Sequence, residues 1–417
     1  MSQRLVQLAR TGGMTIAWLM VVPCLVLLLS AIVPVVPWLR LYALNVVPNN
    51  SSWLFLWSFT GLMIGLLAYA RGRTSVALGL VAVAASATLA TTAVILHLLY
   101  VAESNGARIE LVRALSLREI SSGARADESH VYSRPKGEAL WLDIYHARRP
   151  PGVLSPVLLA VHGGGFFEGD RRFGAANLRW YADRGWTVIS IDYRLARADR
   201  PTWNLATEDV ECALAWTAAH AGALGIDLDR LTLTGGSAGG SLAMAAGFAV
   251  NAKQADATCH GHIPHVGAVV VKVPLIDAFG SWYKAGELQP LQRSYLTRYL
   301  GGSPEQYPER YAAVDLRPQQ WPSNPPTLII GGADDPIVPP EAAVEFTRRA
   351  TAAGLDIRHI LFPYSGHDFN LGFDGITNQA MLQIIEQFLI AHKLGPEPRA
   401  HRIDHWPRSL SGAVQPS

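Results

Sequence analysis

The stretch Leu231-Thr232-Leu233-Thr234-Gly235-Gly236-Ser237-Ala238-Gly239-Gly240 decides the fold of this chain. Its first four residues read as a short buried strand, and the small and apolar residues after Ser237 predict a helix that begins at once. A sharp strand-to-helix turn with the pattern G-x-S-x-G exposes the serine hydroxyl, and its glycines remove side chains that would clash there. No lysine follows the glycines, which excludes a phosphate-binding P-loop. Ser237 is therefore the candidate nucleophile.

A second glycine motif, His162-Gly163-Gly164-Gly165-Phe166, comes directly after a predicted strand. Backbone N–H groups that no side chain obstructs can point at a developing oxyanion, as they do in HGGG loops. We expect Gly163, Gly164 and Gly165 to form an oxyanion hole together with the N–H group of Ala238. The side chain of His162 is expected to hold this loop by hydrogen bonds rather than to react.

The partners of a serine nucleophile should follow it in the order acid, then histidine. One predicted strand leads into a loop that contains Asp334 and Asp335, and the next leads into a loop that contains His367 and Asp368. Both loops lie where parallel strands end at the carboxyl edge of a sheet. We expect Asp335 to be the acid and His367 the base. Asp334 is the alternative acid, and Asp368 is interpreted as a loop-capping residue.

The region 139–394 alternates short apolar runs with longer helical patterns. Such alternation predicts an α/β fold, with a mainly parallel sheet that helices cover on both faces. A linker with a short helix, 103–138, precedes it and ends in the first strand of a hairpin. Strands are expected at 130–132, 140–145, 157–161, 187–191, 231–234, 266–271, 327–330 and 357–362, and helices at 205–221, 238–252, 341–353 and 377–392.

Charge is distributed unevenly along the chain. Although the sequence has 35 basic and 33 acidic residues, its first 102 residues contain five arginines and no Asp or Glu. Three uncharged stretches, about 14–38, 53–70 and 75–102, are each long enough to cross a bilayer as a helix. We therefore expect a three-helix transmembrane anchor over 1–102, with a cleavable signal peptide as the alternative for its first stretch. His97, near the end of the third stretch, is expected to have an interfacial structural role.

The arginines of the anchor indicate its orientation. Arg4, Arg10, Arg71 and Arg73 lie on one side and Arg40 on the other, which favours a cytoplasmic N-terminus. Three spans then place the large domain outside the cytoplasm, although three arginines soon after the third span argue the other way. No basic cluster or motif accompanies the net charge of +2, so nucleic-acid binding is not expected.

The cysteines and their neighbours leave one question open. Three cysteines are too few for a disulfide framework. Cys259, His260, His262 and His265 form a dense cluster, which we interpret as a solvated loop rather than a metal site because no carboxylate supports it. Whether Cys259 pairs with Cys212 is not decided by the sequence.

The motifs together resemble those of the hormone-sensitive-lipase-like carboxylesterases of the α/β-hydrolase superfamily, and bacterial Lip-type esterases with N-terminal membrane spans are similar over nearly the whole chain. The sequence departs from many of these esterases at Gly236, where they have an acidic residue. The resemblance implies an α/β-hydrolase fold and hydrolysis of short- or medium-chain acyl esters without a cofactor. The expected anchor adds lipid-like esters to the candidate substrates, because these are concentrated at a membrane surface. It rests on His162 to Phe166, Asp192 to Arg194, Ala215-Trp216, Gly235 to Gly240, Asp335 to Pro339 and Gly366 to Asp368.

Two further expectations concern the insertion and the end of the chain. The aromatic stretch 278–321 interrupts the alternation of strands and helices, and an insertion at this place often builds a lid over the acyl pocket, with plain core packing as the alternative. The tail 395–417, which contains four prolines, is expected to be disordered.

Other activities remain open at this point. The same three side chains serve an acyltransferase whose acceptor is a lipid or cell-envelope alcohol, and a serine peptidase is less compatible with the HGGG loop. A membrane scaffold without activity is the alternative from another class, and it leaves the full set of catalytic residues unexplained.

Overall fold

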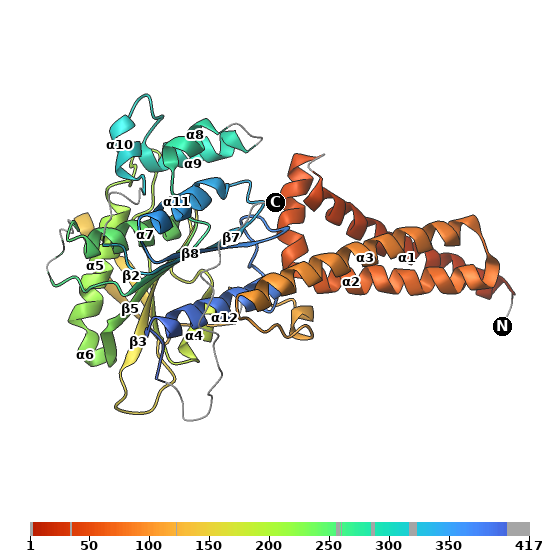
Figure 1. Ribbon diagram of the computed structural model, residues 1–417, viewed down its shortest axis with the longest axis horizontal. Coiled ribbons are helices and arrows are strands. Elements are labelled where there is room, and N and C mark those ends of the chain that lie inside the picture. The colour runs from red at the N-terminus through yellow and green to blue at the C-terminus, as the bar shows by residue number, and fades with distance from the viewer. Residues whose placement is uncertain are drawn as a thin grey trace.

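The structure is a computed structural model that describes residues 3–33, 36–121, 123–255, 259, 261–284, 288–316 and 323–397. The expected tail therefore lies outside the described residues except for 395–397. Two parts of the chain are evident in Figure 1, a bundle of long helices and a sheet that helices surround.

The short apolar runs form an eight-stranded sheet with the order β1-β2-β4-β3-β5-β6-β7-β8. β1 pairs antiparallel with β2, and β2 pairs antiparallel with β4, whereas every other neighbouring pair is parallel. The predicted mainly parallel sheet is thus confirmed. The strands are β1 (Glu128–Ser133), β2 (Leu140–Tyr145), β3 (Ser155–Val161), β4 (Thr187–Ile191), β5 (Ile226–Gly236), β6 (Ala268–Lys272), β7 (Thr327–Gly332) and β8 (Ile357–Phe362).

Helices cover both faces of this sheet. Because successive side chains of a strand point to opposite faces, Leu158 and Ala160 of β3 enter one apolar core and Val157 and Leu159 enter the other. The first core contains α4 (Ala175–Ala182) and α12 (Ile376–Ala391), and the second contains α5 (Ala206–Ala219), α7 (Ala238–Asn251) and α11 (Glu341–Ala352). The short helix α6 (Ala221–Leu224) follows α5.

The expected insertion 278–321 lies between β6 and β7. It forms α8 (Ala278–Tyr283), α9 (Gln289–Leu300) and α10 (Pro308–Ala313), while 285–287 and 317–322 lie outside the described residues. These helices form a separate layer above the sheet in the view of Figure 1.

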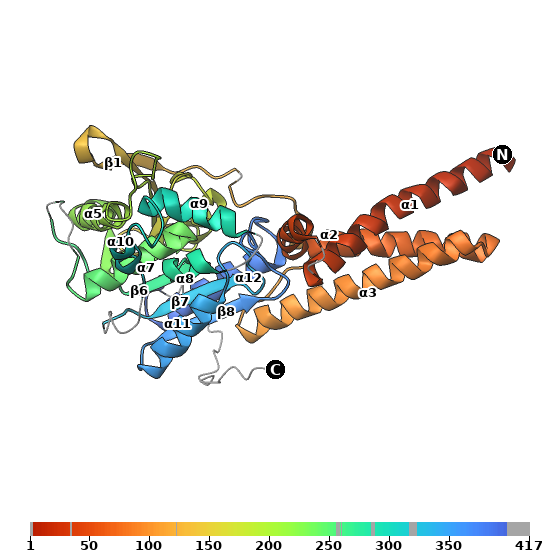
Figure 2. The ribbon, with the colours of Figure 1, turned by 90° about the horizontal axis from the view of Figure 1, so that it is seen from above.

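Three helices form the N-terminal bundle: α1 (Gln3–Ile32), α2 (Pro37–Gly72) and α3 (Ser75–Ser104). Each contains a stretch long and apolar enough to cross a membrane. α2 and α3 are joined by a tight turn in which the Thr74 hydroxyl accepts a hydrogen bond from the N–H of Ala77 at 3.2 Å. This turn and the N-terminus lie at the end of the bundle remote from the sheet (Figures 1 and 2).

The second helix differs from the expected span 53–70 because it begins at Pro37. Asn50 has non-helical angles (φ −129°, ψ 18°) and divides α2 into two halves. The first half, residues 37–49, runs across the long axis of the bundle in Figure 1 and is seen nearly end-on in Figure 2. We call residues 37–49 the crosswise segment. α1 ends at Ile32, so the expected first span 14–38 extends too far.

The expected linker helix is also shorter than predicted. After α3 the chain forms only a 3-10 turn, η1 (Arg113–Leu115), and a second such turn, η2 (Pro135–Gly137), joins β1 to β2. The Trp53 indole N–H of α2 donates to the carbonyl of Leu115 at 3.0 Å, which fixes this region to the bundle.

Candidate active site

Ser237 lies at the sharp turn between β5 and α7. Its backbone angles (φ 53°, ψ −125°) are unusual for a residue with a side chain, as expected where a strained turn presents a nucleophile. The turn packs closely against the end of β3. A Cβ atom on Gly239 would lie 2.2 Å from the carbonyl oxygen of Val161, so a side chain has no room there. The glycines thus allow the serine turn to lie against the strand that leads into the HGGG loop.

The structure brings Ser237, His367 and Asp335 together from three loops. The Nε2 atom of His367 lies 2.9 Å from the Ser237 Oγ atom, and its Nδ1 atom lies 2.7 Å from the Asp335 Oδ2 atom. The other carboxylate oxygen of Asp335 accepts hydrogen bonds from the N–H groups of Ile337 and Val338 at 2.8 and 2.9 Å. These bonds fix the carboxylate so that one oxygen faces the imidazole.

Burial and charge act in opposite directions on His367. The His367 side chain is 11% exposed and that of Asp335 is 1% exposed. Burial disfavours the charged imidazolium, but the Asp335 carboxylate and, more weakly, Asp368 favour it, and the net effect raises the pKa of His367 above its usual value. A histidine in this setting is able to take up a proton and hold it as an imidazolium.

The HGGG loop lies beside Ser237. A Cβ atom on Gly163 would lie 3.5 Å from the Ser237 Cβ atom, so the two loops are adjacent. Gly164 and Gly165 have positive φ (116° and 57°), and within the described part of the chain their N–H groups donate to no protein acceptor. The N–H group of Ala238, the first residue of α7, is likewise outside the hydrogen bonding of its helix. Within the described residues these three N–H groups are therefore not engaged by the protein itself.

His162 holds this loop in the way expected from the sequence. Its ring is buried and stacks on Tyr193 with a centroid distance of 4.4 Å, and its Nδ1 atom lies 2.6 Å from the carbonyl oxygen of Gly163. The Tyr193 hydroxyl donates to the carbonyl of His162 at 3.1 Å. Burial lowers the pKa of His162, so the ring is neutral near pH 7.

Asp334, the alternative acid, and Asp368 both contact the crosswise segment. The Asp334 carboxylate accepts a hydrogen bond from the Arg40 guanidinium of the crosswise segment at 3.0 Å. The backbone of Asp368 is hydrogen bonded to side chains of that same segment. The Nδ1 atom of His97 in α3 lies 3.4 Å from the Tyr364 hydroxyl, and its expected role at the membrane interface stays a prediction.

The insertion packs on both halves of the site. The Phe166 ring of the HGGG loop stacks on Tyr299 of α9 at a centroid distance of 3.7 Å, and Phe167 lies 5.2 Å from Tyr295 of the same helix. On the other side, the Gln292 amide donates to the carbonyl of Ile337 in the acid loop at 2.9 Å. α9 therefore connects the HGGG loop with the loop of Asp335.

Lys272 is a residue near the site that the sequence analysis did not single out. It ends β6, and its carbonyl accepts a hydrogen bond from the Ser237 N–H at 2.8 Å. A Cβ atom on Gly236 would lie 3.3 Å from the Lys272 Cε atom, so the lysine side chain lies beside the glycine that stands in place of an acidic residue. Burial lowers the pKa of Lys272 to about 8, and Asp368 opposes this shift. No sequence motif marks such a lysine.

Cys212 of α5 and Cys259 form a disulfide with a Cα–Cα distance of 5.5 Å. The pairing answers the question that the sequence left open. Because Cys259 is oxidised in this disulfide, it is not available as a thiolate ligand in the cluster with His260, His262 and His265. His260 lies outside the described residues.

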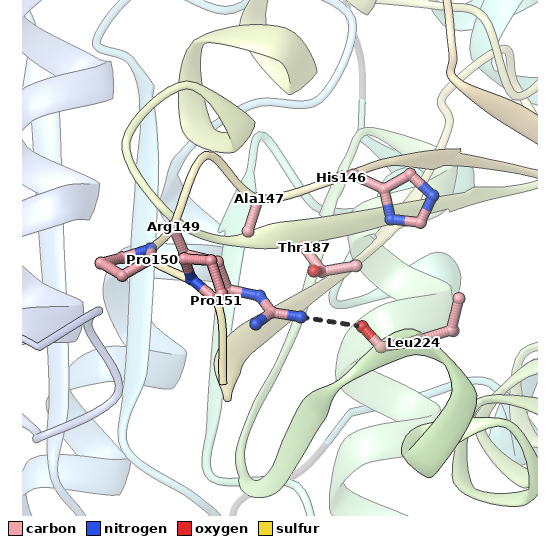
Figure 3. Close-up of a pocket in the computed structure, with 7 residues that line it drawn as sticks. All are labelled: His146, Ala147, Arg149, Pro150, Pro151, Thr187 and Leu224. Atoms are coloured by element: carbon pink, nitrogen blue, oxygen red, sulfur yellow. Dashed lines mark hydrogen bonds between the residues drawn. The ribbon is translucent and has the colours of Figure 1, made fainter. Parts of the chain in front are cut away.

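A cavity of about 300 Å³ lies at the amino ends of the strands, at the opposite edge of the sheet from Ser237 (Figure 3). The Arg149 guanidinium extends into it and donates to the carbonyl of Leu224 at 3.4 Å. Thr187, the first residue of β4, is also part of its wall. This cavity is separate from the site of Ser237.

Comparisons with known proteins agree with this geometry. The BD-FAE family model matches residues 142–349. Esterase LipC of Mycobacterium tuberculosis is 32% identical over 60% of this chain and 61% of its own length, and an ethyl acetate hydrolase of Pseudomonas putida is 30% identical over 52% of this chain and 67% of its own. The propionate-bound esterase Est2 of Thermogutta terrifontis superimposes with a TM-score of 0.54 at 25% identity, covering 67% of this chain and 98% of Est2.

The fold and the site define an α/β-hydrolase. Within that superfamily the chain belongs to the hormone-sensitive-lipase-like carboxylesterases. The chain spans about three fifths of the length of LipC.

Proposed function

We propose that this protein is a membrane-anchored serine esterase that hydrolyses carboxylic esters through an acyl-serine intermediate. The single observation that carries the proposal is the hydrogen-bonded chain from the Ser237 Oγ atom through His367 to Asp335, with distances of 2.9 and 2.7 Å. The names of the relatives, which are esterases and ester hydrolases, support the same reaction.

The proposed first half-reaction transfers the acyl group to the protein. The Ser237 oxygen attacks the ester carbonyl while the His367 Nε2 atom takes the serine proton. The negative charge on the carbonyl oxygen is stabilised by N–H groups of Gly163, Gly164, Gly165 and Ala238. When the tetrahedral intermediate collapses, the bond to the alkoxy oxygen breaks and His367 gives its proton to the departing alcohol.

The second half-reaction repeats these steps with water. His367 takes a proton from a water molecule, whose oxygen attacks the acyl carbonyl, and then returns the proton to the Ser237 oxygen as the acid leaves. Asp335 keeps the imidazole in the correct orientation and stabilises its charged form in both halves. The reaction needs no cofactor.

The bundle supplies the proposed membrane attachment. Each of its three helices contains a stretch that is long and apolar enough to cross a bilayer. Arg71 and Arg73 follow the end of α2 that is remote from the sheet, and by the positive-inside rule they support a sheet outside the cytoplasm. The disulfide between Cys212 and Cys259 supports this side, since disulfides persist in oxidising compartments. Lipid-like esters are concentrated at such a surface.

The experiment that tests the function is labelling with a fluorophosphonate probe, which reacts with activated serines. The full chain should be labelled and should hydrolyse a short aryl ester, and Ser237→Ala should do neither. Equal labelling of the two proteins would show that Ser237 is not the nucleophile, and no labelling of the wild type would favour an inactive scaffold. Analysis of the products from an isotopically labelled ester distinguishes the free acid expected here from the new ester of an acyltransferase.

A further inference from the structure

The crosswise segment of α2 is hydrogen bonded to the loop that carries His367. The carbonyl of Leu44 accepts a hydrogen bond from the N–H of Gly366 at 3.0 Å. The Asn45 Oδ1 atom accepts one from the N–H of Asp368 at 3.4 Å, and the Asn49 Nδ2 atom donates to the carbonyl of Asp368 at 2.8 Å. The residues immediately before and after the histidine are therefore both held by the N-terminal bundle.

Asn49 extends this contact further along the same loop. Its Oδ1 atom accepts a hydrogen bond from the N–H of Gly372 at 2.9 Å, and its Nδ2 atom also donates to the carbonyl of Asn45 at 2.7 Å. One amide side chain thus joins the helix to two points of the histidine loop. An amide is suited to this position because it offers a donor and an acceptor at once.

The fit between the crosswise segment and the loop is close. A Cβ atom on Gly366 would lie 3.1 Å from the Asn45 Oδ1 atom and 3.1 Å from the Leu44 Cβ atom. Leu44 is fully buried in the same apolar core as Phe369, which follows the histidine by two residues. Trp38, by contrast, is 71% exposed. One side of the crosswise segment is therefore part of the core beneath the histidine loop.

We infer that Asn45 and Asn49 are positioning residues that set the place of His367 relative to Ser237. The inference rests on the proposed function, because it assigns to these residues a task in that reaction. The hydrogen bonds hold Gly366 and Asp368, and the imidazole between them depends on their position. A displacement of a reacting group by about 1 Å can reduce a rate by a factor of about 100. The bundle is then a part of the active site as well as an attachment to the membrane.

The test compares Asn49→Leu with Asn50→Ala in the full chain in detergent. The change at Asn49 removes its bonds to Asp368 and Gly372 and leaves those of Leu44 and Asn45. The Asn50 side chain donates to the carbonyl of Val46 in its own helix at 3.2 Å. We expect Asn49→Leu to lower kcat by 10-fold to 100-fold with little change in KM. The rate of fluorophosphonate labelling should fall by the same factor. Asn50→Ala should keep kcat within about twofold of the wild type.

A second variant keeps the test decisive if Asn49→Leu fails to fold. Asn49→Asp has the same shape and retains the acceptor for Gly372, but it places a carboxylate oxygen against the carbonyl of Asp368. It should lower kcat by an intermediate factor at an unchanged midpoint of thermal unfolding. A kcat equal to that of Asn50→Ala in folded Asn49 variants would overturn the inference. Since wild-type labelling tests the proposed function separately, the two failures are distinguishable.

Discussion

The Arg40 Nη2 atom lies 3.0 Å from the Asp334 Oδ1 atom, although the two residues are 294 positions apart in the chain. The pair connects the crosswise segment to the residue that directly precedes the candidate acid. Burial raises the pKa of Asp334, and the positive charge of Arg40 opposes this effect. The Asp334 carboxylate is thereby directed to the bundle, and Asp335 alone of the two faces the imidazole of His367.

This arrangement predicts different results for two conservative substitutions. Asp335→Asn should lower kcat by about 10⁴-fold, because the amide removes the negative charge that orients and stabilises the imidazolium. Asp334→Asn keeps the shape of a side chain that does not contact His367. Its decrease in kcat should therefore be smaller than that of Asp335→Asn by about two orders of magnitude or more. Steady-state kinetics on a short ester measures both. A larger loss for Asp334→Asn would reverse the assignment of the acid.

The acidic limb of the pH profile should reflect the raised pKa of His367. The residue accepts the serine proton only when it is neutral, so kcat/KM falls as the pH decreases through this pKa. Since the charges of Asp335 and Asp368 raise the pKa of His367 by more than burial lowers it, the midpoint of this acidic limb should lie above the usual histidine value of 6.5. In Asp335→Asn the larger charge contribution is lost, and the limb of the residual activity should move to lower pH. A wild-type midpoint below 6.5 would contradict the expected balance of burial and charge.

The disulfide predicts a defined number of free thiols. Of the three cysteines, only Cys24 should react with a maleimide in denaturant without reductant, and all three should react after reduction. Intact-mass measurement on protein isolated from its membrane gives the count. The double variant Cys212→Ser with Cys259→Ser should lose about 2 to 4 kcal/mol of unfolding free energy in chemical denaturation. Three reactive thiols before reduction would argue against an oxidising compartment.

The contact of α9 with the HGGG loop predicts a role in the choice of acyl chain. Tyr295→Ala removes the ring that lies against Phe167, and the space gained should favour longer acyl chains. The ratio of kcat/KM for an eight-carbon ester to that for acetate should rise on the order of tenfold. Tyr283→Ala in α8 is the control, since this side chain is 46% exposed. If both variants show the wild-type ratio, the insertion is packing rather than a lid.

The sequence was sufficient to predict the sheet and the loops that carry the candidate site. The reason is local: strand patterns that end in glycine motifs specify turns such as that of Ser237, and parallel strands bring their carboxyl ends to one edge. The order of acid and base along the chain then suggested Asp335 and His367. The sequence favoured Asp335 over Asp334, and the structure adds a reason that local patterns do not contain, because Asp334 is paired with the distant Arg40.

The sequence did not predict the crosswise segment, and the reason is physical. Pro48 and a run of asparagines interrupt its apolar pattern, so it does not read as a membrane span or as an amphipathic helix. Its helical structure is supported by contacts with residues about 320 positions away, including Asp368 and Gly372. Local patterns contain no information about such pairs. The same limit applies to the side chain of Lys272 beside Gly236.

The order of protein synthesis gives the contact between Asn49 and Asp368 a further consequence. The two residues are 319 positions apart, so the ribosome finishes α2 long before it reaches the histidine loop. At ~5 to 20 residues per second this interval lasts roughly 15 to 60 seconds, whereas a helix forms in about a microsecond. The early helices are thus in place as a template when the last strands emerge. The catalytic centre is completed only when the end of the chain folds onto its beginning.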